Sequence, residues 1–319
     1  MKPDLINFYD NHPVAVDTAA EILDGLRQKQ KSISPKYFYD TRGSKLFDQI
    51  CTLPEYYPTR VETQLLQQHR EDIAHHVGDN TMLIELGSGS SEKVRPLLDA
   101  IEPDSYLPMD ISRDHLRQSA ERLAQDYPWL DIHAVCTDFT QELDAPVARD
   151  NDNATVFFPG SSIGNFEPDQ AVGLLESIAD FLESDGGLLI GVDTKKDIDV
   201  LERAYNDADG VTEAFNKNIL TRINTELNAN FMVDNFSHNA FYNDQHGRIE
   251  MHLVSNCDQL VNIDNETFGF RKGESVHTEN SYKYHKLEFD ELAHNSGFNP
   301  VDTWQDEDNL FNIHFYKKQ

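Results

Sequence analysis

Between residues 81 and 193 short apolar runs alternate with amphipathic stretches, and this alternation limits the possible folds more than any other feature of the sequence. The expected strands are 81–86, 105–109, 132–136, 154–158 and 188–192. The expected helices are 91–101, 114–127 and 169–182. Strands joined through helices form a parallel sheet covered on both faces, because parallel strands need crossover connections. We therefore expect an α/β fold with a doubly wound, Rossmann-like sheet.

This alternation of strands and helices ends after Asp193. Helix is expected over 198–227, with an interruption at Asp209-Gly210, and the next strand-like runs do not alternate with helices. Those runs are 238–242, 248–255 and 275–284, followed by a helix at 288–295 and a strand at 309–316. We therefore expect two domains, each built from separated segments. The sheet domain comprises 61–196 plus 286–319, and an α+β domain comprises 1–60 plus 197–285.

The chain carries 56 acidic and 27 basic residues, a formal net charge of −29. A surface with this much negative charge repels nucleic acid and anionic membranes, and neither is therefore expected as a partner. The charge is either a solvated coat or an adaptation to a saline habitat, where salt screens the self-repulsion. The coat leaves no obvious apolar interface, and we expect a monomer. Three separated cysteines without a Cys-x-x-Cys pair, no secretion signal and no long apolar run predict a cytoplasmic protein.

The turn Glu85-Leu-Gly87-Ser-Gly89 joins the first of these strands to a helix. Glycines there let the backbone approach a ligand, although such a turn can also be merely tight. Asp110 ends the next strand, where an acid can hold ribose hydroxyls. Asp138-Phe139 ends the third strand and offers a carboxylate and a ring to an adenine base. Together these positions predict an adenosine cofactor.

The choice of cofactor depends on Glu92, which occupies the third glycine position of the dinucleotide fingerprint. A glutamate beside a helix N-terminus repels a pyrophosphate, which disfavours a dehydrogenase. S-adenosylmethionine carries no phosphate and fits better. The sequence has neither a Walker lysine motif nor a kinase signature.

Several residues are candidates for a polar acceptor pocket. Asn165 follows the fourth strand at the ligand-binding edge of the sheet, unless it caps a turn or the next helix. Glu279 and Ser281 are two apart in a strand and point to one side, as they also would on a solvated edge. Tyr205 is either a core aromatic or a ligand contact. The proline-rich segment 53–60 is expected to be a loop displaying two tyrosines.

Two other classes of chemistry are disfavoured. The 13 histidines show no His-Glu-x-x-His or other ligand spacing, so no metal is expected. Ser161 and Ser162 do not lie in a Gly-x-Ser-x-Gly elbow, which argues against a hydrolase.

Long, non-repetitive stretches of the chain resemble the histidine Nα-methyltransferases of ergothioneine biosynthesis. The matching stretches are 37–40, 43–44, 46–50, 53–60, 85–89, 91–93, 160–161, 163–165, 204–205, 210–212, 214–216, 248–251 and the pair Glu279-x-Ser281. The resemblance covers nearly the whole chain. It implies a class I methyltransferase sheet and a second, substrate-binding domain made from the N-terminal segment and an insertion.

The resemblance also implies roles for individual residues. Binding of S-adenosylmethionine is implied for Gly87, Lys93, Asp110, Asp138 and Phe139, with Tyr39 close by. Asn165 and Tyr205 match residues that grip the substrate α-carboxylate, and Gly160 lies near the amine. Tyr56, Glu279 and Ser281 match residues around the imidazole, with Met251 lining that pocket. Ser91 stands at the third small position of the loop, which the family tolerates in place of glycine.

The implied reaction is three successive methyl transfers to the α-amine of L-histidine, giving trimethylhistidine (hercynine). Two alternatives stay open: an N-methyltransferase of another amino acid such as tryptophan, and a non-catalytic S-adenosylmethionine-binding regulator. The −29 charge disfavours a nucleic-acid methyltransferase. No general base is evident in the sequence.

Overall fold

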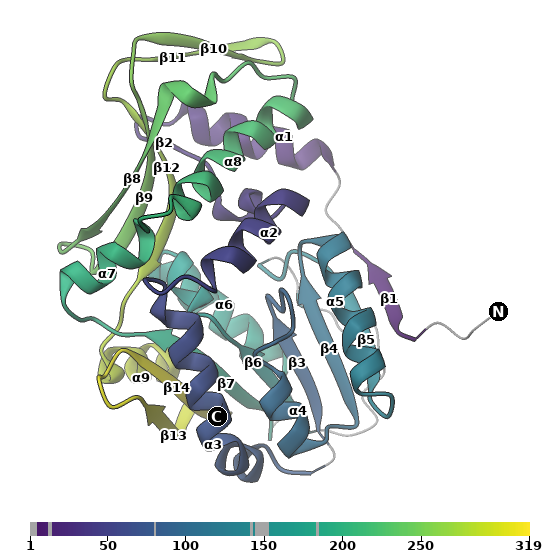
Figure 1. Cartoon of the computed structure of the whole chain (residues 1–319). Helices are drawn as coiled ribbons and strands as arrows, with labels where there is room; N and C mark the ends of the chain where they lie inside the picture. The colour runs from purple at the N-terminus through teal and green to yellow at the C-terminus, as the bar shows by residue number, and fades with distance from the viewer. Residues whose placement is uncertain (1–4, 12–14, 80, 141–142, 144–152, 183–184) are drawn as a thin grey trace. The chain divides into compact units, whose positions relative to one another are not determined.

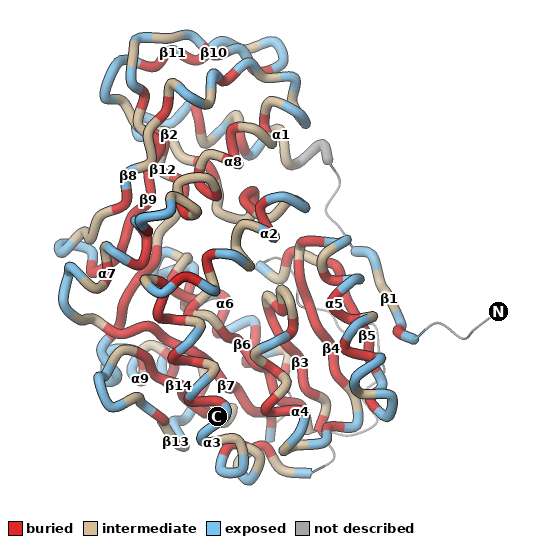
Figure 2. Tube along the Cα trace, in the orientation of Figure 1, coloured by how far each residue is buried: buried red, intermediate tan, exposed pale blue. Residues whose placement is uncertain are grey.

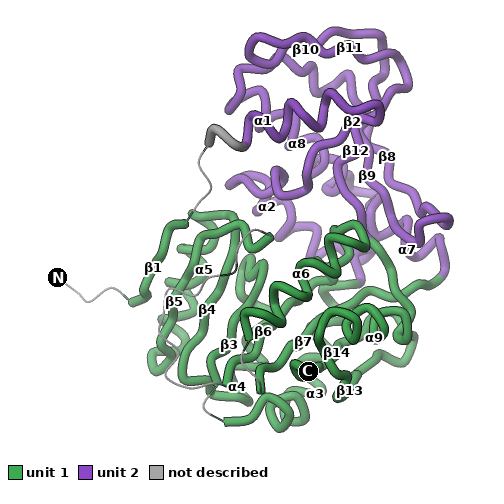
Figure 3. Tube along the Cα trace, turned by 180° about the vertical axis from the view of Figure 1, so that it is seen from behind, with its two compact units in different colours: residues 1–12, 58–196, 282–319 green, residues 13–57, 197–281 purple. Residues whose placement is uncertain are grey.

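The computed structural model describes residues 5–11, 15–79, 81–140, 143, 153–182 and 185–319. The chain divides into two compact units, drawn in different colours in Figure 3. Unit 1 comprises residues 1–12, 58–196 and 282–319, and unit 2 comprises residues 13–57 and 197–281.

Unit 1 contains an eight-stranded sheet in the order β1-β5-β4-β3-β6-β7-β14-β13 (Figure 1). Its strands are β1 (Asn7–Asp10), β3 (Met82–Leu86), β4 (Ser105–Asp110), β5 (Asp131–Cys136), β6 (Ala154–Phe158), β7 (Gly187–Asp193), β13 (Phe298–Gln305) and β14 (Phe311–Lys318). Strands β1 to β7 of this sheet pair in parallel, and β14 and β13 add antiparallel pairs. The strand order reverses between β3 and β6. At such a reversal the carboxyl ends of the strands open a crevice for ligands.

Helices cover both faces of this sheet. They are α3 (Tyr57–Val77), α4 (Arg95–Ile101), α5 (Arg113–Asp126), α6 (Pro168–Phe181) and α9 (Lys286–Asn295). Helices α3, α4 and α5 lie on one face and α6 and α9 on the other, as Figures 1 and 3 show from opposite sides. All residues of β6 and β7 are buried (Figure 2), because helices cover both faces of the sheet at these central strands. This explains the continuous apolar runs of the sequence.

Two N-terminal assignments made from the sequence need correction. Residues 1–60 were expected in the second domain, but β1 pairs with β5 in the sheet of unit 1. Four residues at a sheet edge carry no alternation, so only the backbone pairing reveals this strand. Segment 53–60 is not a loop throughout, since Tyr57 and Pro58 open the long helix α3. Proline is tolerated in a first helical turn, and both tyrosines, Tyr56 and Tyr57, are buried rather than displayed.

Unit 2 combines a four-stranded sheet, ordered β2-β12-β9-β8, with helices and a hairpin. Its elements are α1 (Ala15–Arg27), β2 (Lys31–Ser32), η1 (Pro35–Phe38), α2 (Thr41–Ile50), α7 (Ile198–Tyr205), α8 (Val211–Glu226), η3 (Val233–Asn235), β8 (Phe236–Asn243), β9 (Arg248–Ser255), β10 (Gln259–Ile263), β11 (Glu266–Phe270) and β12 (Ser275–Tyr282, whose last residue belongs to unit 1). Ile249, Met251 and Leu253 of β9 are buried on one face of the sheet. Gly210 adopts a φ of +71° between α7 and α8, which confirms the expected interruption.

The segment 197–281 leaves unit 1 and returns to it at neighbouring positions. Thr194, just after β7, forms a parallel β-bridge with Tyr284. The Tyr284 amide donates to the carbonyl of Asp193 at 3.1 Å. The buried ammonium of Lys283 lies 2.7 Å from Oδ2 of Asp193. The exit and the return of this segment are therefore held together within unit 1. None of the described helices is long and apolar enough to cross a membrane.

Candidate active site

The turn after β3 is tied to the end of β4. Gly87 and Gly89 adopt φ values of +68° and +50°, which favour glycine. The amides of Gly87 and Ser88 donate to the carbonyl of Met109 at 2.8 and 3.2 Å. A Cβ on Gly87 would lie 3.8 Å from the ring of Phe139, so this turn and the end of β5 face one another.

Two carboxylates lie at neighbouring strand ends. Asp110 accepts hydrogen bonds from the amides of Gly89 (2.9 Å) and Ser112 (2.8 Å). Burial raises the pKa of the Asp110 carboxyl above its usual value, and those two amides oppose the rise. Asp138 is buried and accepts from the amide of Thr140 at 3.1 Å. With the Phe139 ring beside Gly87, this edge fits an adenosine group: two acids for hydroxyls and an amine, and an aromatic face for a base.

Lys93 and Gly160 meet at one side chain that the sequence analysis did not single out. The Lys93 ammonium lies 2.7 Å from Oε2 of Glu62, and the amide of Gly160 donates to the same carboxylate. Asn165 ends the 3₁₀ turn η2 (Ser162–Asn165) after β6 and is half-buried. Helix α6 is capped instead by Glu167 in a reciprocal capping box, so Asn165 is not its cap.

The remaining candidates belong to unit 2, where four of them gather. The Tyr205 hydroxyl, at the end of α7, donates to Oγ of Ser281 at 2.8 Å. The Tyr205 ring packs edge-on against Tyr56, with centroids 6.2 Å apart. Burial raises the pKa of the Tyr56 phenol well above its usual value, and nearby Tyr205 and Glu279 add to the rise. Tyr56, Tyr205, Glu279 and Ser281, 225 residues apart at most in the sequence, thus form one polar group, in which Tyr56, Tyr205 and Ser281 are buried and Glu279 is half-buried.

Tyr39 and Met251 complete the set in unit 2. The Tyr39 ring packs edge-on against Phe47 and Phe215, with centroids 5.7 and 5.8 Å away. Met251 is buried on β9, and its carbonyl accepts from Oγ1 of Thr278 at 3.0 Å. The structure therefore places the candidates in two groups. Unit 1 holds Gly87, Lys93, Asp110, Asp138, Phe139, Gly160 and Asn165, and unit 2 holds Tyr39, Tyr56, Tyr205, Met251, Glu279 and Ser281.

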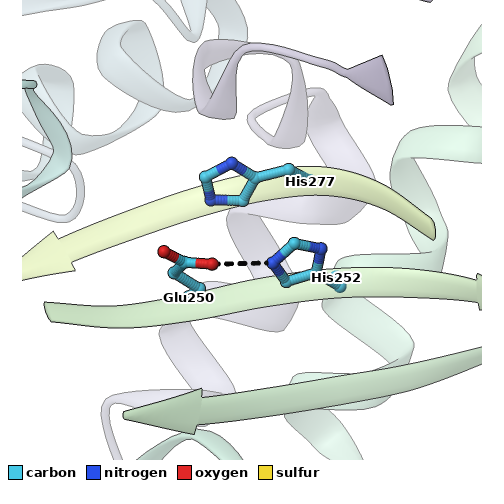
Figure 4. Close-up of side chains that lie close together, drawn as sticks. All are labelled: Glu250, His252 and His277. Atoms are coloured by element: carbon cyan, nitrogen blue, oxygen red, sulfur yellow. Dashed lines mark hydrogen bonds and ion pairs between the residues drawn. The ribbon is translucent and has the colours of Figure 1, made fainter. Parts of the chain in front are cut away.

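One cluster of metal-ligand type lies outside these groups (Figure 4). Glu250 and His252 of β9 and His277 of β12 offer ligand atoms within 4.8 Å of one another. Nε2 of His252 lies 3.0 Å from Glu250, and Arg248 holds the other carboxylate oxygen at 2.7 Å. The two imidazoles stack with centroids 4.6 Å apart and an interplanar angle of 10°. Lone pairs in two parallel planes do not converge on one ion, so this cluster is a stacked, hydrogen-bonded network.

A second such group, in unit 1, consists of Asp72 and His76 of α3 and Asp302 of β13. Nε2 of His76 lies 3.2 Å from Asp302, and Asp72 accepts from Nε1 of Trp304 at 2.8 Å. The ligand atoms thus already have partners. The absence of a metal, expected from the sequence, stays a prediction.

Comparison with known proteins identifies the family. The model of the family described as "Histidine-specific methyltransferase, SAM-dependent" matches residues 18–318. The chain belongs to this family. It is 43% identical over 285 residues to the histidine N-alpha-methyltransferase of Mycolicibacterium smegmatis, covering 85% of this chain and 87% of that protein. The protein of the same name from Mycobacterium tuberculosis is 39% identical, with 92% of each chain covered.

A more distant relative bears on the alternative substrate. The 4-dimethylallyltryptophan N-methyltransferase of Aspergillus fumigatus is 26% identical, covering 89% of this chain and 88% of its own. In sequence identity this methyltransferase is therefore nearer to the two proteins named for histidine than to the one named for a tryptophan derivative. The expected family and its class I fold with S-adenosylmethionine as cofactor are confirmed.

Proposed function

We propose that this methyltransferase transfers methyl groups from S-adenosylmethionine to the α-amine of L-histidine, three times, giving hercynine. The observation that carries the proposal is the polar group of Tyr56, Tyr205, Glu279 and Ser281, in which only Glu279 is half-buried rather than buried. Its hydroxyls and carboxylate suit the two nitrogens of an imidazole, one a donor and the other an acceptor. The names of its relatives and its family point to the same substrate.

We propose a role for each candidate residue. On the cofactor side, Asp110 holds the ribose hydroxyls, and Asp138 and Phe139 hold the adenine. Gly87 and Lys93 border the same cofactor, with Tyr39 close by. On the substrate side, Asn165 and Tyr205 hold the α-carboxylate, Gly160 borders the amine, and Tyr56, Glu279, Ser281 and Met251 surround the imidazole. In this assignment unit 1 binds the cofactor and unit 2 the histidine side chain.

The chemistry is a direct displacement. The cofactor supplies an electrophilic methyl group: the amine lone pair forms the new N–C bond while the S–C bond breaks, and S-adenosylhomocysteine leaves. Only the neutral amine can attack. A peptide α-amine has a pKa of about 7.7–8.0, and the α-amine of a free amino acid has a higher pKa. The residues that grip the carboxylate and imidazole hold the amine in place, and the proton passes to water. Positioning supplies much of the rate enhancement.

The decisive experiment is a substrate screen. The purified enzyme is incubated with S-adenosylmethionine and each amino acid separately, and the masses of the products are measured by mass spectrometry. Histidine should gain one, two and then three methyl groups. Gain on tryptophan and none on histidine would reassign the substrate. Binding of S-adenosylmethionine without methylation of any amino acid would indicate a regulator.

We also propose that the enzyme is a cytoplasmic monomer. The large apolar side chains that are exposed among the described residues are spread over separate elements, such as Trp129, Met232, Leu260 and Leu287. A stable dimer interface has a contiguous apolar core. Light scattering over a concentration series should give the monomer mass of 36.5 kDa, and a doubled mass would overturn this proposal.

A further inference from the structure

Glu62 lies in the second turn of helix α3 and is fully buried, with 0% of its surface exposed. Its Oε1 and Oε2 accept a shared hydrogen bond from the amide of Gly160, at 2.8 and 3.0 Å. Oε2 also lies 2.7 Å from the ammonium of Lys93. Isolated burial of a carboxylate is costly, and here a cation and a backbone donor compensate for it.

Two glycines shape the surroundings of this carboxylate. A Cβ on Gly191, in β7, would lie 2.0 Å from Oε1 of Glu62, so this strand position has room for the carboxylate only without a side chain. Gly160 has a φ of +82°, and a Cβ there would lie 3.1 Å from Nζ of Lys93. Residues from α3, β7 and the segments after β3 and β6 thus fit closely around one side chain.

We propose that Glu62 is a positioning residue for methyl transfer, fixing Lys93 and the Gly160 backbone relative to each other. The inference rests on the proposed roles of Lys93 beside the cofactor and Gly160 beside the amine. One carboxylate touches both, so it sets the spacing between the donor and acceptor sides of the reaction. A displacement needs the nucleophile and the methyl group in line, and an error of about 1 Å can cost about 100-fold in rate.

The rival interpretation is that Glu62 only attaches α3 to the sheet. Two conservative variants separate these interpretations because they disturb different contacts. Glu62→Gln keeps an oxygen that can accept from the Gly160 amide but loses the charge opposite Lys93. Glu62→Asp keeps the charge but is one methylene shorter, so it cannot reach both partners. A control on the same helix is Asp72→Ala, because Asp72 attaches α3 to Trp304 of β13 by a 2.8 Å hydrogen bond that alanine cannot accept.

Each variant is characterised by its thermal unfolding, the dissociation constant of S-adenosylhomocysteine from calorimetry, and kcat and KM for histidine. Glu62→Gln should weaken S-adenosylhomocysteine binding by about tenfold, because Lys93 is no longer held by the Glu62 charge and contributes about one charged hydrogen bond less to the proposed cofactor site. Glu62→Asp should keep that affinity within about threefold and lower kcat by about 100-fold. Asp72→Ala should lower the melting temperature without changing the dissociation constant, kcat or KM.

The inference is overturned if both Glu62 variants keep the wild-type dissociation constant, kcat and KM while melting earlier, since that is the behaviour of a structural contact. If only one variant folds, its own constants decide, because each has a distinct expected change. If instead the proposed substrate is wrong, the wild type would not methylate histidine. Loss of S-adenosylhomocysteine affinity in Glu62→Gln would then still support the positioning of Lys93.

Discussion

The hydroxyl of Tyr205 donates a 2.8 Å hydrogen bond to the hydroxyl of Ser281, joining the end of α7 to the end of β12. Both side chains are buried, so each hydroxyl depends on partners within the protein or on a ligand. A site residue that is already hydrogen-bonded needs little reorganisation to receive a substrate. This bond therefore fixes two of the proposed histidine contacts before histidine binds.

Tyr205→Phe removes that hydroxyl and should lower kcat/KM for histidine by about tenfold, since a neutral hydrogen bond contributes about 0.5–1.5 kcal/mol. Affinity for S-adenosylhomocysteine should not change. The matched control is Tyr37→Phe, which removes a buried hydroxyl of the same unit that donates to Glu21 at 2.9 Å. Steady-state kinetics and calorimetry measure both. Equal losses of activity in the two variants would show a general effect of destabilising unit 2.

Glu279→Ala should reduce kcat/KM for histidine by at least about tenfold, because a hydrogen bond to a charged group contributes about 1.5–3 kcal/mol. The loss should appear mainly in KM, because the imidazole is remote from the reacting amine. Competition between histidine and tryptophan in one reaction, followed by mass spectrometry, measures the selectivity. Unchanged histidine turnover would remove Glu279 from the proposed site.

Asp110→Asn should weaken S-adenosylhomocysteine binding by at least about tenfold, measured by calorimetry. The carboxylate accepts from two backbone amides, those of Gly89 and Ser112, on different oxygens. An amide side chain presents one acceptor and one donor, so one of these N–H groups would face an NH₂ group. The turn after β3 would then shift. Wild-type affinity in a folded variant would contradict the role of Asp110.

Stability should fall as the pH rises from about 5 to about 8, through Glu85. Burial raises the pKa of Glu85 to about 8, against the opposing effects of the Tyr106 hydroxyl and the Lys93 charge. A carboxyl whose pKa is higher in the folded state than in the unfolded state binds more protons when folded. Its contribution to stability is therefore greatest below the unfolded pKa and is lost as the pH approaches the folded pKa.

The neutral variant Glu85→Gln isolates this effect. Denaturant unfolding at a series of pH values should show a flatter dependence for the variant over this range than for the wild type. Parallel curves would mean that Glu85 titrates normally. The Tyr106 hydroxyl donates to Glu85, so the amide can keep that bond through its oxygen.

The central sheet was predictable because its strands are covered on both faces and read as continuous apolar runs. Strands β6 and β9 have the expected bounds, and β7 and β14 differ from expectation by one or two residues. Helix α4 begins at Arg95 rather than at residue 91, because Ser91 adopts a left-handed φ of +56° and still belongs to the turn. Local patterns do not show such a backbone conformation at a serine.

Elements whose apolar residues show no clear periodicity were not predicted from the sequence. Strand β13 has a register shift between Pro300 and Asp302, which breaks the alternation that would identify a strand. The hairpin of β10 and β11 was also not expected. Among the candidate site residues, single positions such as Asn165 were proposed from their place at strand ends. Glu62 was missed because its partners, Lys93 and Gly160, are distant in the sequence. Only the folded chain brings a helical glutamate to them.

The bridge between Thr194 and Tyr284 has a consequence for how this architecture can diversify. Segment 197–281 starts and ends next to positions that unit 1 itself pairs, so the two ends are held together within unit 1. Long insertions between ends that are already adjacent are thermodynamically inexpensive. Related enzymes can therefore change the proposed acceptor contacts that this segment carries, Tyr205, Met251, Glu279 and Ser281, without altering the pairing of the cofactor sheet. Divergence of acceptor specificity within such a lineage should be concentrated in this insertion.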